Sequence, residues 1–395
     1  MNSTDASTSQ RVPMLRLSSF YFAYYAALGA FTPYWSLYLK GTGQDVAAIS
    51  VLMSLWYATR VVAPSTWSTL AARSANPVHW LRIGCVLTLL SFSAFTLELD
   101  FAWLFVVMCV FCFMYNAVMP QFESITLSHL VGRAERYGRI RVWGSIGFVA
   151  VVALFGVSLD HLPVTALPWL MLPLFAGMLA SAMMNDYGRT PAAQAEADTV
   201  NFLSRLRRPE VIAFFIVALL MQLSFGPYYT FYSIYLDEHG YSSSALGMFW
   251  SIGVIVEIAV FTFSTWIFRR WSASTVLLIS LVAASLRWAV IALWPDSVAL
   301  MTIAQTLHAL SFAGFFAASM QFLVKFFPGR QNGHAQGIFY GFSSGIGGVL
   351  GALLSGLVWK VSGGDTAFLL ASATSAVAAV VAWVWIRPRR QEAPA

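Results

Sequence analysis

Residues 34–61 read YWSLYLKGTGQDVAAISVLMSLWYATRV, and residues 231–258, which lie 197 positions further on, read FYSIYLDEHGYSSSALGMFWSIGVIVEI. Six positions are identical in this register: Ser36/Ser233, Tyr38/Tyr235, Leu39/Leu236, Gly43/Gly240, Ala48/Ala245 and Ser54/Ser251. A shift of 200 gives a second match, which places Ile146, Gly147, Val149, Leu154 and Gly156 on Ile346, Gly347, Val349, Leu354 and Gly356. The chain therefore consists of two copies of one structural unit.

The composition places both copies in a membrane. Of 395 residues, 58% are hydrophobic and 10% are charged, whereas soluble domains have roughly 45–50% and about 25%. A transmembrane helix needs about 20 mostly apolar residues. The apolar runs predict an all-α protein with twelve transmembrane helices near 14–39, 45–70, 79–97, 101–130, 138–158, 165–186, 209–236, 243–268, 273–294, 297–325, 335–359 and 366–386.

The two repeats predict the domain organisation. We expect an N-terminal six-helix bundle at 1–186, a linker at 187–208 and a C-terminal six-helix bundle at 209–395, because the longest polar stretch falls at the middle of the chain. Since six is even, both bundles enter the membrane from the same side, which makes them parallel repeats. This arrangement resembles that of major facilitator transporters.

The basic residues indicate the orientation. Nineteen of the 23 Lys and Arg residues fall on the side of the two termini, only Lys40 and Lys360 lie opposite, and Arg60 and Arg287 lie within helices. By the positive-inside rule, both termini are predicted to be cytoplasmic. The net charge of +6 is therefore a topology signal and does not indicate nucleic-acid binding.

Several functional classes lack their usual motifs. The sequence contains no P-loop, no His-Glu-x-x-His zinc pair and no Gly-x-Ser-x-Gly elbow, which argues against ATP-driven transport and hydrolase chemistry. Cys109 and Cys112 are interpreted as helix packing residues, and no cofactor or metal is expected. A series of glycines predicts close helix packing along the eleventh helix: Gly337, Gly341, Gly345, Gly347 and Gly351.

Few ionisable residues fall at membrane depth in the predicted helices. The candidates are Arg60, Glu123, Arg141 near the cytoplasmic end of its helix, Glu257, Arg287 and His308. Such residues are costly in a bilayer and often mark a transport pathway, although each could also belong to a structural ion pair. The 197-residue shift places Arg60 on Glu257, so opposite charges are expected to flank a common cavity. An enclosed carboxylate can load and release a proton, which makes Glu257 and Glu123 candidates for coupling. His308 alone is more typical of packing than of proton transfer.

Tyrosines are dense on the first and seventh helices. Tyr228, Tyr232 and Tyr235 share one helix face, because they are four and three residues apart. They could line a cavity, or they could form an interfacial aromatic belt. The belt is the favoured interpretation for Tyr38 and Tyr235, and both interpretations stay open for Tyr25 and Tyr228.

The stretch Tyr137-Gly-Arg-Ile-Arg-Val-Trp-Gly-Ser-Ile-Gly-Phe148 resembles the signature of the phenylpropionate permease family. Further matching motifs lie at Phe31 to Gly41, at Arg60, at Glu257 with Phe268 to Arg270, at Leu286 to Trp288 and at Gln305 to His308. The resemblance implies proton-driven uptake of a small aromatic carboxylate, such as 3-phenylpropionate, across a bacterial inner membrane. Independently, guanidinium groups pair well with carboxylates, and tyrosine rings stack on aromatic solutes.

A more distant resemblance is to lactose permease. Its Pro-x-x-Glu motif followed by a sugar-site arginine matches Pro120, Glu123 and Arg141, and the positions of its cysteine and stacking tryptophan match Ser145 and Phe148. Arg287 and His308 match its helix 9 arginine and helix 10 histidine. Ser311 and Gln305 replace its helix 10 carboxylate and lysine, so its proton route does not transfer unchanged.

These features give one hypothesis for the site. Arg60 and Arg141 hold the carboxylate, Glu123 orients Arg141, and Ser145 and Phe148 with Tyr25 or Tyr228 complete the substrate-binding set. Glu257 carries the proton, tuned by Arg287 and His308, and the protein is expected to work as a monomer. The alternatives are a sugar or nucleoside symporter and a non-transporting sensor. An intramembrane enzyme built on Ser145, His308 and Glu123 is disfavoured, because the repeats and the charge distribution predict a carrier.

Overall fold

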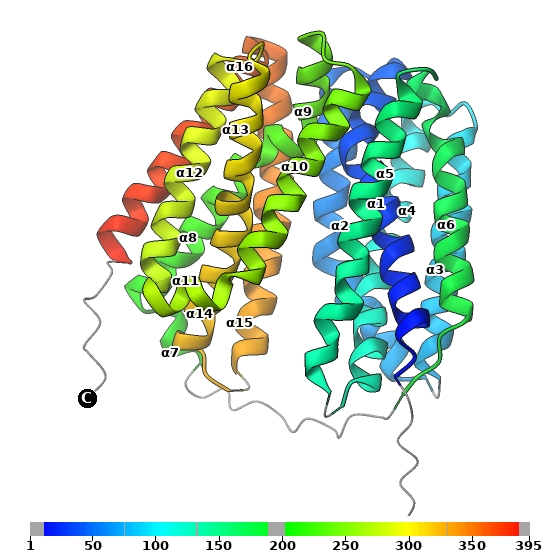
Figure 1. The fold of residues 1–395 in the computed structure, drawn as a ribbon, viewed down its shortest axis with the longest axis horizontal. Helices are drawn as coiled ribbons and strands as arrows, with labels where there is room; N and C mark the ends of the chain where they lie inside the picture. Colours follow the sequence, from blue (N-terminus) through cyan, green and yellow to red (C-terminus); the bar gives the residue numbers. More distant parts are fainter. Residues whose placement is uncertain (1–11, 75, 132, 189–201, 330, 387–395) are drawn as a thin grey trace, which may run out of the picture.

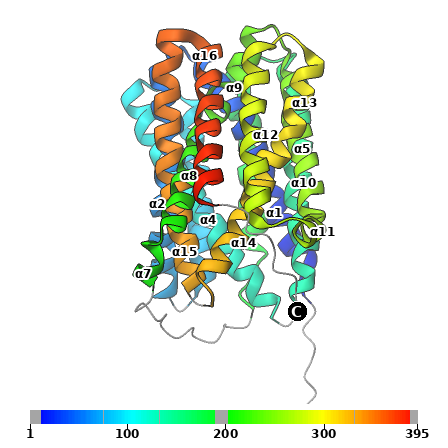
Figure 2. The same cartoon turned by 90° about the vertical axis from the view of Figure 1, so that its left-hand side faces the viewer.

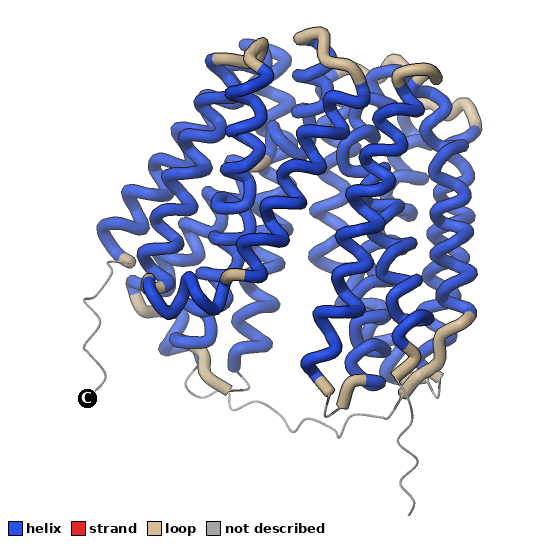
Figure 3. Tube along the Cα trace, in the orientation of Figure 1, coloured by secondary structure: helices blue, strands red, loops and turns tan. Residues whose placement is uncertain are grey.

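A computed structural model describes residues 12–74, 76–131, 133–188, 202–329 and 331–386. Within these ranges the chain forms helices joined by loops and turns, with no strand (Figure 3). The predicted all-α membrane fold is therefore confirmed. The termini and most of the predicted linker, residues 189–201, lie outside the described residues, as do several of the arginines that predict the orientation.

The N-terminal half contains six long helices: α1 (Met14–Gly41), α2 (Val46–Ala72), α3 (Pro77–Ser93), α4 (Phe101–His129), α5 (Tyr137–Leu159) and α6 (Leu167–Met183). Side chains cap three helix starts, because Asp45, Asn76 and Asp100 accept hydrogen bonds from the backbone N–H groups of the first turn. Short 3-10 turns at Ala94–Thr96, Ala134–Arg136 and Val164–Ala166 join the longer helices.

The C-terminal half has more interruptions. Its elements are α7 (Phe202–Leu206), α8 (Pro209–Ser224), α9 (Gly226–Glu238), α10 (Ser243–Thr262), α11 (Ser264–Arg270), α12 (Ala273–Leu293), α13 (Val298–His308), η4 (Ala309–Gly314), α14 (Phe315–Phe326), α15 (Gln331–Phe339), η5 (Tyr340–Gly347) and α16 (Gly348–Trp385). Both η4 and η5 are π-helical, a geometry that is frequent at functional sites. Gly363, at φ 81°, bends α16 into two limbs.

Each of the twelve predicted ranges lies on a helical segment. By length and composition, ten stretches of the described residues could cross a membrane. One of the ten is the 55-residue stretch Gln331–Trp385, which Gly363 bends, and the 28-residue α1 is not among the ten. The apolar pattern therefore placed the helices correctly. The count of candidate spans differs from twelve because two predicted helices fall in the one stretch Gln331–Trp385 and α1 is not among the ten.

The two halves lie side by side, with α1–α6 to the right and α8–α16 to the left in Figure 1. Figure 2 gives the view onto the C-terminal half. We call the lower end in Figure 1, where α7, α11 and α15 lie, the basic side, and the upper end the opposite side. Between the halves, α5 packs against α10, and α2 packs against α16 and η5.

Polar contacts join the halves on the opposite side. Lys40 Nζ lies 3.1 Å from Asp237 Oδ2 and 3.2 Å from Glu238 Oε1. The Ser244 backbone N–H donates to Asp160 Oδ1 at 3.1 Å. At Gly156, an added Cβ would lie 2.8 Å from the Ser243 carbonyl oxygen, so only glycine permits this approach. The halves are thus tightly closed at this end.

Toward the basic side the halves diverge (Figure 1). The predicted packing is confirmed for Gly351, whose Cβ would lie 2.9 Å from the Leu223 carbonyl oxygen, and Gly345 contacts Val61 of α2. For Gly337 and Gly341 the prediction is wrong, because no atom lies within 4 Å of an added Cβ. Their stretch of the eleventh helix lies nearer the basic side, where the two halves are apart.

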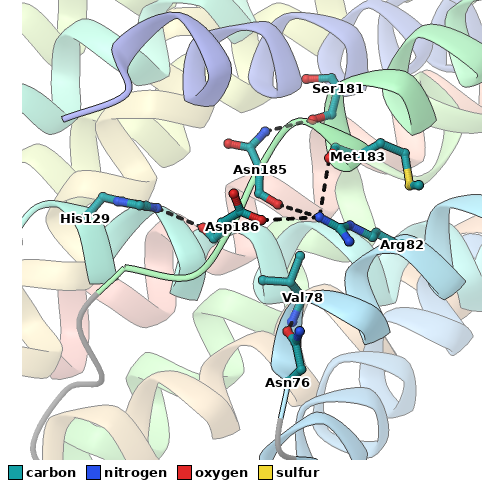
Figure 4. A network of polar contacts seen from close by, with 8 residues as sticks. All are labelled: Asn76, Val78, Arg82, His129, Ser181, Met183, Asn185 and Asp186. Carbon is teal, nitrogen blue, oxygen red and sulfur yellow. Dashed lines mark hydrogen bonds and ion pairs between the residues drawn. The ribbon is translucent and has the colours of Figure 1, made fainter. Parts of the chain in front are cut away.

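The residues just before the predicted linker are fixed to α3 and α4 of the N-terminal half (Figure 4). Arg82 Nη2 donates to the Asn185 carbonyl at 3.1 Å and lies 3.4 Å from Asp186 Oδ1. His129 Nε2 lies 2.8 Å from the Asp186 carbonyl oxygen. The Asn185 side chain donates to the Ser181 carbonyl at 2.8 Å. These contacts hold Asp186 against α3 and α4.

Candidate transport site

Two tyrosines from different helices hold Glu123 on α4. Tyr21 of α1 donates its hydroxyl to Glu123 Oε2 at 2.7 Å, and the hydroxyl of Tyr137 at the start of α5 donates to Oε1. Both carboxylate oxygens are therefore hydrogen-bonded. Among the described ion pairs, which extend to 4.0 Å, none joins Glu123 to Arg141. In this conformation, no described ion pair supports the expected role of Glu123 in orienting Arg141.

Arg141 instead contacts Tyr25 of α1. Its Nη2 donates to the Tyr25 hydroxyl at 2.6 Å, and its guanidinium carbon lies 4.0 Å from the centre of that ring. Gly144 permits this arrangement, because a Cβ there would lie 2.7 Å from the Tyr25 ring and 2.8 Å from Arg141 Nη1. Gly144 of the Tyr137–Phe148 signature thus makes room for a stacked arginine that is partly exposed.

Arg60 on α2 is exposed and lies 5.6 Å from the Trp56 ring centre. It acts electrostatically on Tyr25, together with Arg141, Glu123 and Glu257. Of these four residues, Arg141 has the described contact with Tyr25, and the other three act on it at longer range. That Arg60 and Glu257 face a common cavity stays a prediction.

In the C-terminal half, the carboxylate of Glu257 lies beside the imidazole of His308. His308 Nε2 lies 3.8 Å from Glu257 Oε2, and the two side chains are 7% and 21% exposed. His308 packs closely on Gly253, one helical turn before Glu257. It also precedes the π-helical segment η4. Glu257 therefore lies at the edge of the protein interior, with the imidazole behind it.

Arg287 on α12 lies deeper. Its Nη2 donates to Gln305 Oε1 at 3.1 Å, and its guanidinium carbon lies 4.1 Å from the Tyr228 ring centre. The Tyr228 hydroxyl also donates to Gln305 Oε1, at 3.2 Å, while Gln305 Nε2 donates to the Tyr232 hydroxyl at 2.6 Å. Arg287, Tyr228 and Tyr232 thus meet at one glutamine.

The remaining predicted residues have less specific surroundings. Ser145 is partly buried, and Phe148 is 8% exposed. The backbone of Phe148 supports α1, because a Cβ at Gly29 would lie 2.6 Å from its carbonyl oxygen. Among the described ring pairs, Phe148 has no contact with Tyr25 or Tyr228, so the structure does not bring these rings together.

The predicted aromatic belt is wrong for Tyr38 and Tyr235. Both side chains are buried between helices. The Tyr38 hydroxyl donates to the Phe95 carbonyl at 3.0 Å, and the Tyr235 hydroxyl donates to Asp365 Oδ1 at 2.5 Å. A tyrosine at a helix end can satisfy its hydroxyl inside the bundle as readily as in the headgroup layer.

The sequence did not identify the tyrosines that hold Glu123, although one signal was available. Tyr137 precedes Arg141 by one helical turn, so both project from the same face of α5. Tyr21 comes from α1, and its position depends on how α1 packs against α4. Gln305 was noted in a family motif and as a departure from lactose permease but was given no role, whereas in the structure it joins Arg287, Tyr228 and Tyr232.

Comparison with known protein families shows which family this chain belongs to. The model of the MFS_1 like family matches residues 14–370. The chain belongs to the MFS_1 like family. This match covers both halves and every residue of the candidate site.

The names of similar proteins refer to different solutes. The chain is 28% identical over 304 residues to the Probable 3-phenylpropionic acid transporter of Escherichia coli (strain K12), covering 77% of this chain and 80% of the relative. It is 25% identical over 354 residues to the Maltose permease of Geobacillus stearothermophilus, covering 87% of each. The crystal structure of nucleoside transporter NupG superposes with a TM-score of 0.83 at 19% identity, covering 95% of this chain and 99% of that one.

These comparisons establish a membrane transporter of the major facilitator type that is not an enzyme. The NupG likeness, at 19% identity, shows the fold alone. The predicted resemblance to major facilitator transporters is confirmed by the family model, and the chain is similar to a probable 3-phenylpropionic acid transporter, as the Tyr137–Phe148 motif predicted.

Proposed function

We propose that this transporter carries a small aromatic carboxylate, such as 3-phenylpropionate, into the bacterial cytoplasm together with protons. The observation that carries the proposal is the stacking of the partly exposed Arg141 on Tyr25, with the exposed Arg60 stacked on Trp56 in the same half. Guanidinium groups stacked on aromatic rings suit an aromatic anion. Two nearby carboxylates supply sites for a coupled proton.

The N-terminal half provides the carboxylate site in this proposal. Arg141, which is partly exposed and stacked on Tyr25, and Arg60, which is exposed, hold the solute carboxylate. Glu123 keeps its tyrosine partners and contributes negative charge near Arg141. Ser145, Phe148 and Tyr25 or Tyr228 line the space for the solute.

The C-terminal half provides the proton site. Glu257 carries the proton, and His308 and Arg287 tune it through the contacts described above. Binding the anion near Arg60 and Arg141 changes the charge beside Glu257 and thereby links solute to proton. The halves, which are closed on the opposite side here, alternate by opening there and closing on the basic side. We infer that the basic side and both termini are cytoplasmic, in the inner membrane, and that one copy suffices.

Uptake into proteoliposomes tests this proposal. Radiolabelled 3-phenylpropionate is offered with an inward proton gradient, with and without a protonophore. We expect accumulation that the protonophore abolishes and that Arg60→Ala removes. Arg73→Ala is the matched control, because Arg73 is an exposed arginine at the end of the same helix. Wild-type protein that is folded but shows no uptake contradicts the proposal.

A sugar or nucleoside symporter is the second candidate. The 25% identity to a maltose permease favours it, as does the Glu123 and Arg141 spacing shared with lactose permease. Competition of labelled 3-phenylpropionate uptake by sugars and nucleosides separates the two. Solute binding without any uptake from either panel indicates a sensor.

A further inference from the structure

Arg287 is a cation enclosed in the C-terminal half with most of its donors unused. Its side chain is 0% exposed. Nη2 donates to Gln305, but Nε and Nη1 have no hydrogen-bond partner among the described residues. These two nitrogens carry three of the five N–H donors of a guanidinium. Within the described part of the chain, no carboxylate lies within 4.0 Å of Arg287.

This environment does not neutralise the charge. Arginine keeps its proton in proteins, so burial cannot be relieved by deprotonation. The rings of Tyr228 and Trp288, at 4.1 and 4.4 Å, provide cation–π stabilisation. A ring face offers no lone pair to N–H donors that lie in the guanidinium plane. A buried charge without a partner is strongly unfavourable, and a bound anion would satisfy both the charge and the unused N–H donors.

The acid of this half is engaged elsewhere. Glu257 contacts His308 rather than Arg287, although both Glu257 and Arg287 act electrostatically on Tyr228. Neutral donors that can turn toward a small anion surround the guanidinium. They are the hydroxyl of Tyr228 and the side-chain amide of Gln305, which now bond to each other.

We propose that Arg287 forms an anion-binding site inside the C-terminal half that takes one monovalent anion. Two sources share this chemistry, namely the carboxylate of the transported acid and an inorganic halide. The carboxylate source rests on the proposed function, whereas the halide source does not. The site is separate from Arg60 and Arg141 and converts Arg287 from a tuning residue into a ligand-binding one.

Anion-dependent thermal unfolding of the purified full-length protein in nanodiscs tests the site. Sodium bromide or sodium 3-phenylpropionate is titrated while sodium sulfate keeps the ionic strength constant. An anion that binds only the folded state raises the midpoint. We expect Arg287→Gln to weaken the apparent affinity for one of the two anions by about tenfold to a hundredfold. Arg73→Gln is the matched control, because Arg73 is an exposed arginine outside both sites, and it should keep both anion responses.

The outcomes separate the two sources. A bromide response lost in Arg287→Gln assigns a halide, and a 3-phenylpropionate response lost in that variant assigns the carboxylate. Responses equal to those of the wild type in Arg287→Gln, or no response of the wild type to either anion, overturn the site. If the wild type does not transport 3-phenylpropionate but keeps an Arg287-dependent bromide response, the proposed function fails and the anion site stands.

A second measurement covers a variant that does not fold. Crystals of the wild type grown with bromide, or with a ring-brominated 3-phenylpropionate, are measured at the bromine absorption edge. A bromide peak in contact with the Arg287 guanidinium, or a brominated solute whose carboxylate meets it, supports the site. Anomalous peaks confined to other places contradict it.

Discussion

The two halves contain the same types of polar residue in opposite arrangements. In the N-terminal half the acid Glu123 is held by two tyrosines, and the cation Arg141 is partly exposed and stacked on Tyr25. In the C-terminal half the cation Arg287 is buried, and the acid Glu257 lies at the edge, with 21% of its side chain exposed. One half therefore presents positive charge to the space between the halves, and the other presents negative charge.

This difference suggests a division of labour within a repeated fold. A guanidinium is permanently charged and suits a permanent anion, whereas a carboxylate can gain or lose a proton. The accessible group of each half then matches one of the two transported species. The pseudo-equivalent positions of Arg60 and Glu257 express the same contrast within a single repeated helix.

Removing the proton site should have the largest effect. Glu257→Gln keeps the shape of the side chain but cannot exchange a proton, so accumulation of solute against its gradient should be lost. Exchange of labelled for unlabelled solute should persist, because it needs no net proton movement. Counterflow and gradient-driven uptake in the same proteoliposomes measure the two activities. Unchanged uphill uptake would contradict the assignment of the proton to the C-terminal half.

Glu123→Gln is the matched variant in the other half. It should reduce uphill uptake less than Glu257→Gln does, because tyrosine hydroxyls already occupy both oxygens of Glu123. If Glu123→Gln alone abolishes accumulation, the division between the halves is reversed.

Weakening the carboxylate site should raise KM. Arg141→Lys retains the charge but loses the planar donors and the stacking on Tyr25. We expect the concentration of solute for half-maximal uptake to rise by about tenfold to a hundredfold. Tyr25→Phe should cause a smaller rise, since it removes one hydrogen bond and keeps the ring. Uptake kinetics measure both variants, and an unchanged KM in Arg141→Lys would remove Arg141 from the site.

The sequence predicted the elements of this comparison better than their contacts. Apolar runs located the helices, and the charges within them identified Glu123, Arg141, Glu257 and Arg287. The partners of Glu123 depend on how three helices pack, and a linear pattern does not encode that packing. The 197-residue repeat showed that Arg60 and Glu257 occupy equivalent positions in the two halves. It carried no information about how deeply either side chain is buried.

The helix breaks show the same limit. The break at Phe225 had a signal, because Gly226 and Pro227 follow it and Pro227 suits the first turn of a new helix. The break at Phe263 and the π-helical segment η4 have no glycine or proline at their start. Tertiary packing sets them, so apolar periodicity predicted uninterrupted helices there.

Stability measurements sharpen the contrast between the two clusters. Tyr21→Phe leaves one oxygen of Glu123 without its donor, which should lower the free energy of unfolding by about 1–3 kcal/mol. Arg287→Met removes a buried charge that lacks a protein counter-ion among the described residues. Without added halide or solute, it should leave the stability unchanged or raise it. Thermal unfolding in nanodiscs compares the stability of the two variants. An equal loss of stability in both would contradict the view that Glu123 is fully hydrogen-bonded whereas Arg287 lacks a counter-ion.

The smallest expected effect concerns Asp160, which contacts the C-terminal half on the opposite side. Asp160 accepts hydrogen bonds from the side chain and backbone of Ser244 across the interface, and these lower its pKa. Because opening the opposite side removes these bonds, the pKa is lower in the closed conformation. The stabilisation of the closed conformation is then complete above the ordinary pKa of about 4 and disappears as the pH falls through the lowered value.

Acidification from pH 7 to about 3 should therefore shift the wild type toward opening on the opposite side. The shift is expected to be below about tenfold in population, because Asp160 is exposed and such contacts are weak. Spin labels at Leu162 and Ser362, which are exposed on either half, report the distance. Asp160→Asn separates this contact from the Lys40 pair, whose acids also titrate. An equal response of wild type and Asp160→Asn would show that Asp160 does not hold the halves together.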